Sequence, residues 1–416
     1  MFLDLNIMMN KSSTYCVMPY IGLAVQNHGD FCSCNLNKKS WQDNKKQVMH
    51  VYSHDMTRMF QSHTRKMLGA QLDHGLQDPS CQVCWDAESV GNSSARQYFN
   101  QSFGNVDPLP DQPRVLIIKP GNTCNFACRM CNPMTSSSWY NDGYKLEKAN
   151  MHSSSWYPEE QSNQVSELKF NEYTRTFEHI RKSFNPDNLE FWAVLKKWIE
   201  NLVFIDIYGG EPFLIPALFD LLEHGIHVGS AKHISLKLHT NASIYNKKYM
   251  EILSQYKSLK FSVSIDSSDP AQLEYIRHKS DYTNVIDNSK KFKEFIDNCP
   301  NMFMSISYTV VPFNVFYVDQ HKQELESLLA MPIVFNLVTT PEYDARHLPY
   351  PVKKNLTEKI ENQKVKSFLQ KSIEGCDIEW PKFCGATDLL DKIRNQRFSD
   401  VFPEWWKILE PYWVVK

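Results

Sequence analysis

Three cysteines within eight residues are the part of this sequence best suited to chemistry. Cys124, Cys128 and Cys131 come just after the apolar run 115–118. Iron–sulfur clusters are normally held by four cysteine thiolates. A compact set of three therefore predicts a four-iron cluster in which one iron keeps an open position for a substrate or cofactor. The alternative is a zinc site with His152 as fourth ligand, but zinc prefers a closed set at local spacing and no such ligand is near.

The elements that must hold this triad begin with the run 115–118. From there, short β-rich runs alternate with longer helix-like segments, which is typical of parallel β/α units. The predicted strands are 115–118, 202–208, 234–239, 259–265, 304–311 and 334–338. The predicted helices between them lie near 216–226, 246–257, 284–298 and 319–330. The pattern predicts an α/β fold, with a polar insertion at about 140–195 that would form a helical lid.

Polar residues stand where the predicted strands end, which is the edge at which β/α barrels place their chemistry. The second strand ends in Gly209, Gly210 and Glu211, in a chain with only 14 glycines. Paired glycines at a strand end allow a ligand to approach the backbone, and a tight turn is the plainer alternative. Later strand ends supply Thr240, Asn241, Ser264 and Asp266, followed by Arg277. For these residues the plainer alternatives are strand-end caps and a surface arginine.

Taken in order on successive strands, these motifs resemble those of the radical S-adenosylmethionine (radical SAM) enzymes. The family's Cys-x3-Cys-x2-Cys signature matches the triad, and its Gly-Gly-Glu motif matches residues 209–211. The resemblance covers residues 114–340 and implies a partial (β/α)6 TIM-like barrel. One departure is Met130, where the family often has an aromatic residue that contacts adenine.

The resemblance also implies roles for the strand-end residues. Gly209, Gly210 and Glu211 would bind the ammonium group of methionine, and Arg277 would pair with its carboxylate. The positions that would hydrogen-bond the ribose and methionine parts are Thr240, Asn241, Ser264 and Asp266.

The implied cofactors are S-adenosylmethionine and a 4Fe–4S cluster held by the catalytic cysteines Cys124, Cys128 and Cys131. In the family, the reduced cluster cleaves S-adenosylmethionine to methionine and a 5′-deoxyadenosyl radical, which abstracts hydrogen from a substrate C–H bond. The cofactors carry this chemistry, while the protein orients them and excludes competing reactions. The implied partner is an electron donor such as flavodoxin or ferredoxin.

A second group of cysteines precedes the barrel. Cys16, Cys34, Cys81 and Cys84 resemble the first half of the SPASM motif, whose shortened form is called a twitch domain. The run 81–96 also resembles a signature of N-terminal twitch proteins, many of them of viral origin. The resemblance implies an auxiliary 4Fe–4S cluster with four cysteine ligands, which would act as an electron relay or a structural staple.

Alternatives stay open for the remaining cysteine chemistry. A structural zinc site would use the same four N-terminal residues. Cys32 competes with Cys34 as a ligand, although the spacing from the preceding glycine favours Cys34. Cys299, Cys376 and Cys384 have no partner spacing and are expected to be buried apolar residues, with hydrogen-atom donation to a substrate radical as the alternative for Cys384.

The composition of the chain indicates its number of domains, its partners and its location. The 416 residues carry a net charge of −2 and are 42% hydrophobic, which indicates two to four domains and no need for a polyanionic partner. No apolar run of 18 residues and no signal-like start are present, so we expect a cytoplasmic protein with no membrane partner. The expected domains are an N-terminal twitch/half-SPASM unit at 1–105, the barrel at 114–340 and a mixed C-terminal extension at 341–416.

Three hypotheses concern the substrate. The first is a peptide or protein side chain, because SPASM-like relatives often modify peptides. The second is a nucleotide, nucleic-acid base or sugar, since aromatic residues of the insertion could stack on bases, although no basic stripe supports it. The third is a non-enzymatic, metal-bound interaction module, in which the Gly-Gly-Glu pocket would be needless.

Overall fold

A single sheet organises the molecule. The computed structural model describes residues 12–37, 39–43, 45–51, 59–89, 93–109, 111–149, 168–178, 180, 188–371 and 373–414. Within these residues, eight strands pair in the order β2-β1-β3-β4-β5-β6-β7-β8. They are β1 (Gly22–Val25), β2 (Phe31–Cys32), β3 (Val115–Ile118), β4 (Phe204–Ile207), β5 (Ser235–Thr240), β6 (Ser258–Ser264), β7 (Met302–Val310) and β8 (Ile333–Leu337). All neighbouring pairs are parallel except β1 with β2.

Helices follow the strands, as the alternating pattern predicts. Those before and within the barrel are α1 (Met18–Ile21), α3 (His63–Asp73), α4 (Gln82–Ser89), α5 (Ala95–Phe103), α6 (Tyr140–Lys148), α7 (Phe170–Arg175), α9 (Leu189–Trp198), α10 (Pro216–His227), α11 (Lys247–Ser254), α12 (Pro270–Ile276), α13 (Tyr282–Asp297) and α14 (Val318–Leu329). Those after β8 are α15 (Tyr350–Lys359), α16 (Gln363–Leu369), α17 (Cys376–Arg394), α18 (Phe398–Val401) and α19 (Pro403–Leu409). The predicted α/β fold with a parallel core is confirmed.

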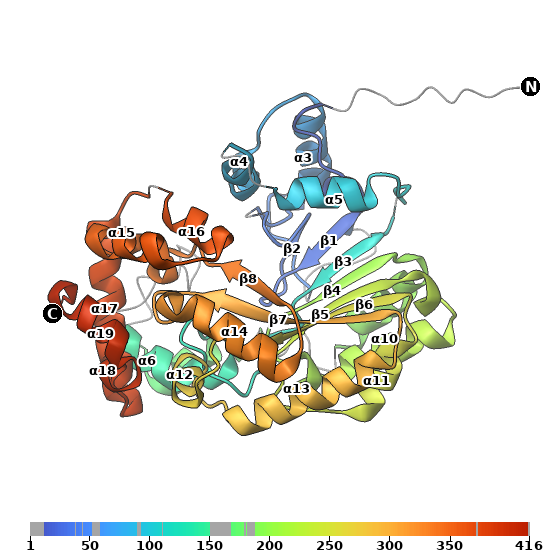
Figure 1. Cartoon of the computed structure of the whole chain (residues 1–416). Coiled ribbons are helices and arrows are strands. Elements are labelled where there is room, and N and C mark those ends of the chain that lie inside the picture. Colours follow the sequence, from blue (N-terminus) through green and yellow to red (C-terminus); the bar gives the residue numbers. More distant parts are fainter. Residues whose placement is uncertain are drawn as a thin grey trace, which may run out of the picture.

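The two faces of the sheet differ sharply in character. Figure 1 shows α10, α11, α13 and α14 on one side of the sheet, with α5 on the other. Successive side chains of a strand point to opposite faces, so β5 turns Leu236 and Leu238 into the helix-covered core and Lys237 and His239 to the other face. We call this second, more polar side the inner face.

The N-terminal segment joins the same sheet. Strand β1 pairs in parallel with β3, with Gly22 opposite Val115 and Val25 opposite Ile118. The sequence analysis predicts no strand in this region, because a four-residue Gly-Leu-Ala-Val run gives little strand signal. The residues first expected to form a cysteine-rich unit therefore share backbone hydrogen bonds with the barrel.

The insertion and the C-terminal extension are helical where they are described. Helices α6, α7 and α9 belong to the expected insertion, and residues 150–167, which include Trp156 and His152, lie outside the described residues. After β8, the described chain forms α-helices and 3-10 turns. Among the described helices, none has the length and apolar character needed to span a bilayer.

Candidate active site

The cysteine loop after β3 is fixed through its backbone. The amide N–H groups of Ala127 and Arg129 donate to the carbonyls of His278 and Ile276, at 2.8 and 2.7 Å. The Trp139 indole donates to the carbonyl of Cys128 at 2.7 Å. These bonds fix the main chain of the loop, so that the thiol side chains are not needed to hold its shape.

Two of the three thiols, those of Cys128 and Cys131, share a hydrogen bond. A hydrogen bond from Cys131, aided by the charge of Arg277, lowers the pKa of Cys128 to about 7 despite its burial. The same bond, together with burial, raises the pKa of Cys131 well above its usual value. Burial raises the pKa of Cys124 to about 12. The thiolate is the form that binds metal, so the positive charge of Arg277 favours the metal-binding form of Cys128.

Arg277 links the cysteines to Asp266. Its Nε lies 2.8 Å from Oδ2 of Asp266 as an ion pair, and its Nη1 donates to Sγ of Cys128 at 3.8 Å. Asp266 is completely buried, and its other oxygen accepts from the Thr309 amide at 2.7 Å. The plainer alternative of a surface arginine is wrong, because only 8% of Arg277 is exposed.

The Gly-Gly-Glu motif packs against the cysteine loop. Gly209 and Gly210 have φ of +95° and +57°, and a Cβ on Gly210 would lie 2.6 Å from the carbonyl oxygen of Thr123. The amide of Glu211 donates to that same carbonyl at 2.8 Å. In this structure the group that approaches Gly210 closely is the protein's own cysteine loop.

Glu211 points inward and is fully buried. Its carboxylate accepts hydrogen bonds from the Thr240 hydroxyl and the Asn241 amide, both at 2.7 Å. Burial raises the pKa of Glu211 to about 7. The carboxylate therefore joins the ends of β4 and β5.

The remaining predicted residues lie at the same edge. Asn241 donates from Nδ2 to Sγ of Cys124 at 3.8 Å and to Oδ1 of Asn125 at 3.0 Å. Ser264 is half-buried at the end of β6 and is paired in register with Ser307. Asn241 thus links the triad by hydrogen bonds to the end of β5. Arg277 and Asp266 link it to the end of β6.

These donor groups fit a three-cysteine iron–sulfur cluster. Two N–H donors, from Asn241 and Arg277, already point at cysteine sulfurs, and such bonds set the potential of a cluster. Within the described residues, no three His, Cys, Asp or Glu side chains converge on a single metal ion. A 4Fe–4S cluster distributes its thiolates over separate irons, so it does not need such convergence.

The four N-terminal cysteines form a second neighbourhood. Desolvation raises the pKa of the half-buried Cys34 thiol, and the proximity of Cys16, Cys81 and Cys84 adds to this shift. Cys32 instead lies near Gln26, Asp30 and Lys119. The structure thus groups Cys34, and not Cys32, with the other three.

The 81–96 signature has a structural role beside these cysteines. Arg96 pairs with Glu88 and donates to the carbonyl of Tyr15 at 2.7 Å, next to Cys16. Ser94 caps α5 and also hydrogen-bonds Glu88. These contacts hold the Cys81–Cys84 turn against the chain that carries Cys16.

Sequence reasoning missed Arg129, which stands between two of the triad cysteines. It is completely buried, its guanidinium lies 3.5 Å from the centre of the Tyr275 ring, and it forms an ion pair with Asp391. Asp391 also accepts from the Tyr275 hydroxyl at 2.8 Å. A charged residue inside an otherwise uncharged metal-binding motif was the available signal, but its partner is 262 residues away.

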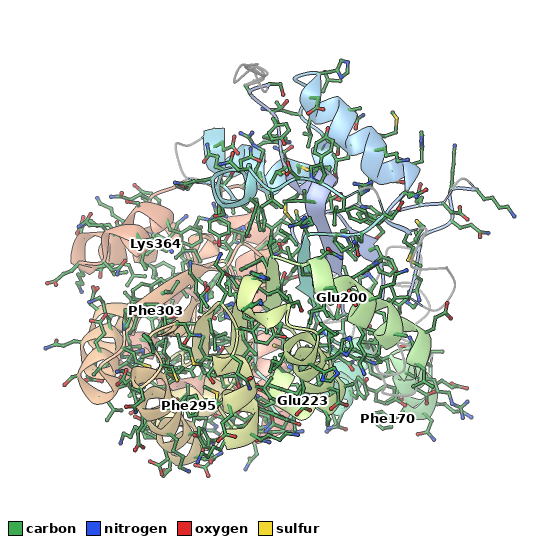
Figure 2. All side chains as sticks on the ribbon, turned by 90° about the vertical axis from the view of Figure 1, so that its right-hand side faces the viewer. Phe170, Glu200, Glu223, Phe295, Phe303 and Lys364 are labelled. Atoms are coloured by element: carbon green, nitrogen blue, oxygen red, sulfur yellow. The ribbon has the colours of Figure 1, made fainter. Side chains whose placement is uncertain are left out.

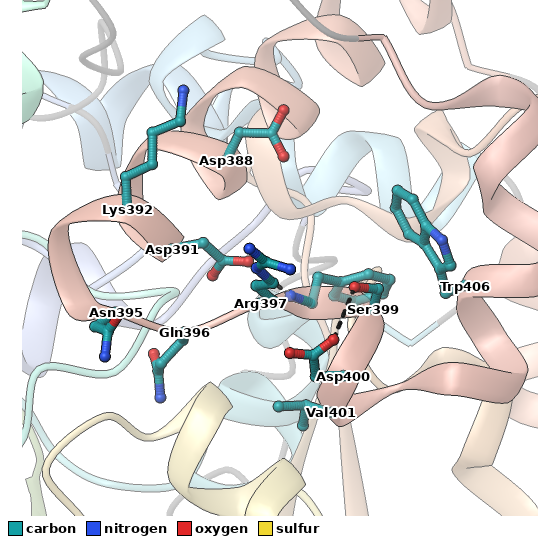
Figure 3. Close-up of a pocket in the computed structure, with 11 residues that line it drawn as sticks. Asp388, Asp391, Lys392, Asn395, Gln396, Arg397, Ser399, Asp400, Val401 and Trp406 are labelled. Carbon is teal, nitrogen blue, oxygen red and sulfur yellow. Dashed lines mark hydrogen bonds between the residues drawn. The ribbon is translucent and has the colours of Figure 1, made fainter.

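A cavity lies behind this ion pair. It has a volume of about 790 Å³, and Asp391 lines it with Gln396 and Asp400 (Figure 3). Arg394, at the end of the same helix α17, donates to the Ala127 carbonyl and pairs with Asp142, both at 2.9 Å. The C-terminal extension therefore supports the cysteine loop from behind.

Comparisons with known proteins agree with this geometry. Residues 118–316 match the model of the Radical SAM superfamily. The match covers slightly less than half of the chain, including the triad and the strand ends described above, and it indicates a radical SAM enzyme. No curated protein matches the chain.

Several solved structures are similar to the chain at low identity. Native anSMEcpe with bound AdoMet is 15% identical, with a TM-score of 0.31 over 68% of this chain and 63% of that one. Streptococcus suis SuiB bound to its precursor peptide SuiA is 13% identical, with a TM-score of 0.32 over 93% and 74%. The chain spans less than two thirds of the length of anSMEcpe. Because these TM-scores are low, the similarity to solved structures adds nothing to the match with the Radical SAM superfamily.

Proposed function

We propose that this protein is a radical SAM enzyme that acts on a peptide or protein side chain. A 4Fe–4S cluster held by Cys124, Cys128 and Cys131 would supply the electron that cleaves S-adenosylmethionine, so that a substrate C–H bond loses a hydrogen atom. The observation that carries the proposal is the convergence of Asn241 and Arg277 on sulfurs of the triad.

The chain's own residues would bind and orient the cofactors. Gly209 and Gly210 let the cysteine loop lie against the end of β4, and Glu211 fixes the backbone of Asn241. Arg277 places a positive charge beside Cys128, where it offsets the charge of bound thiolates. Its remaining donors are available to a methionine carboxylate, and the Thr240, Ser264 and Asp266 strand ends complete the proposed pocket.

We also propose an auxiliary 4Fe–4S cluster at Cys16, Cys34, Cys81 and Cys84. The mutual proximity of these thiols supports it. Structural zinc is the competing occupant. An electron donor such as flavodoxin or ferredoxin would reduce the protein, and either cluster gives it a point of entry.

A peptide substrate is favoured over a nucleotide because of the inner face. That face carries half-exposed polar and aromatic side chains next to the strand ends, and the chain as a whole is slightly acidic. A nucleic acid would be expected to meet a basic surface.

Anaerobic reconstitution tests the proposal. Reduced wild-type protein should convert S-adenosylmethionine to 5′-deoxyadenosine and methionine, and Cys128→Ala should lose this cleavage. The matched control is Cys299→Ala, at a cysteine outside both constellations. Cleavage retained in Cys128→Ala would contradict the site, and no cleavage by wild-type protein with a full iron complement would favour the non-enzymatic module.

A further inference from the structure

A cavity on the inner face lies between the N-terminal segment and the barrel. Its volume is about 360 Å³. Its floor is a row of side chains in register across three strands, Asp206 opposite Lys237 and Lys237 opposite Lys260. The residues that complete its lining are Asn35, Leu36, Ala95, Tyr98, Phe99 and Phe204.

The floor of this cavity carries a surplus positive charge. Nζ of Lys237 lies 3.2 Å from Oδ2 of Asp206, so these two charges compensate each other. Lys260 is exposed, and among the described residues no carboxylate lies within ion-pair distance of it. Two lysines and one aspartate leave one unbalanced positive charge, which suits a singly charged anion.

An apolar wall stands beside this charge. Phe99 and Phe204 are buried in the wall, and Tyr98 is 42% exposed. Phe303, which is labelled in Figure 2, lies opposite Lys260 on β7 and is 54% exposed. A ligand with a carboxylate and a neighbouring apolar group would satisfy both parts.

The cavity and the proposed active site lie at different levels of the same two strands, β5 and β6. Lys237 lies three residues before Thr240 on β5, and Lys260 four residues before Ser264 on β6. At about 3.3 Å per strand residue, these separations are roughly 10 to 13 Å. The half-exposed side chains of Tyr208 and His239 lie on the inner face between the two levels.

We propose that this cavity binds an acidic side chain of the peptide substrate, about three to four residues away from the residue that reacts. The inference rests on the proposed function, and it adds the charge and position of a recognition element. An extended peptide advances about 3.3 to 3.6 Å per residue, which matches the separation between the lysines and the strand ends.

A carboxylate fits this floor better than a phosphate does. Phosphate is usually bound by arginine forks or by several backbone N–H groups, and the cavity lining contains no arginine. Asp206 would also repel a second negative charge. The balance of charge therefore favours Asp or Glu over a nucleotide.

Peptide binding to the reconstituted full chain tests the proposal. The probe is a fluorescein-labelled decapeptide of Ala, Gly and Ser with one Phe and one Glu, compared with the same peptide carrying Gln. We expect the Glu peptide to bind at least ten-fold more tightly in anisotropy titrations. Lys260→Gln should abolish this preference, and Lys260→Glu should reverse it toward a Lys peptide. Lys291→Glu, on the exposed surface of α13, should keep it.

Three results would overturn the proposal. They are equal affinity of the Glu and Gln peptides for wild-type protein, an unchanged preference in Lys260→Glu, and displacement of the Glu peptide more strongly by adenosine monophosphate than by N-acetylglutamate. 5′-Deoxyadenosine formation is measured in parallel. If cleavage and its stimulation by peptides persist while the acidic preference fails, only this inference is wrong, whereas no stimulation by any peptide contradicts the proposed function.

Discussion

At the scale of single residues, buried carboxylates organise the site by binding protein groups. Asp266 neutralises Arg277, and Glu211 accepts from Thr240 and Asn241. A carboxyl that is buried without a cation prefers its neutral form. Glu211 therefore links the protonation of the site to the stability of the strand ends.

The raised pKa of Glu211 should make the free energy of unfolding depend on pH. Burial raises its pKa from 4.5 to about 7, so its contribution to stability is fully present below pH 4.5 and is lost as pH rises through 7. The loss amounts to about 3 kcal/mol. The difference in unfolding free energy between wild type and Glu211→Gln, measured in urea, should shrink by that amount between pH 5 and 8. A difference that stays constant with pH would contradict the shifted pKa.

Replacing Gly210 with alanine should destabilise the protein in two ways, through backbone strain and through a steric clash. Gly229 has the same backbone strain without the clash, so it serves as the control. Gly210→Ala would place Cβ 2.6 Å from the Thr123 carbonyl, whereas Gly229→Ala, also at positive φ, meets open space. Both variants lose roughly 1 to 2 kcal/mol through the left-handed backbone. Gly210→Ala should lose a further 1 to 3 kcal/mol through overpacking, and it should take up less iron. Equal stability of the two variants would exclude the close approach.

At the scale of elements, α17 and the cysteine loop form one unit. Arg129 and Asp391 make the buried contact, and Arg394 adds a bond to the carbonyl of Ala127. Removing one partner of a buried ion pair usually costs about 3 to 5 kcal/mol, because the other charge is left unpaired.

Asp391→Asn should therefore weaken both the fold and the cluster site. We expect an unfolding free energy about 3 kcal/mol lower than that of wild type. At the same protein concentration, the variant should also lose the iron–sulfur absorbance that wild type retains. Asp400→Asn is the matched control, because Asp400 lines the same cavity but is exposed, and its carboxylate accepts a hydrogen bond from the neighbouring Ser399 hydroxyl. Equal iron content in the two variants would show that α17 does not support the loop.

The sequence was most informative where chemistry and periodicity coincide. The six strands β3 to β8 could be predicted, because each is a short β-rich run that ends in polar residues. The role of the triad as cluster ligands stays a prediction. The inward direction of Glu211 could not be predicted, since a motif does not reveal which groups its side chain meets. The Arg129–Asp391 pair and the parallel pairing of β1 with β3 depend on long-range packing that single-sequence patterns do not encode.

At the scale of the whole molecule, β1 joins the N-terminal cysteines to the barrel. Cys34 follows the β1–β2 hairpin, and β1 lies beside β3, which leads into the triad. The two cysteine sets are thus mounted on adjacent strands. A metal lost from the N-terminal set should leave the triad able to assemble, because each set has its own loop.

Iron counting tests this independence. Wild-type protein reconstituted without oxygen should hold about eight irons per chain if both sets bind 4Fe–4S clusters. The double variant Cys81→Ser/Cys84→Ser should hold about four and still cleave S-adenosylmethionine, whereas Cys124→Ser/Cys128→Ser should hold about four and cleave none. Four irons plus one zinc in wild type would assign zinc to the N-terminal set. Loss of all iron in the Cys81→Ser/Cys84→Ser variant would mean that the two sites assemble together, through the strand pair that connects them.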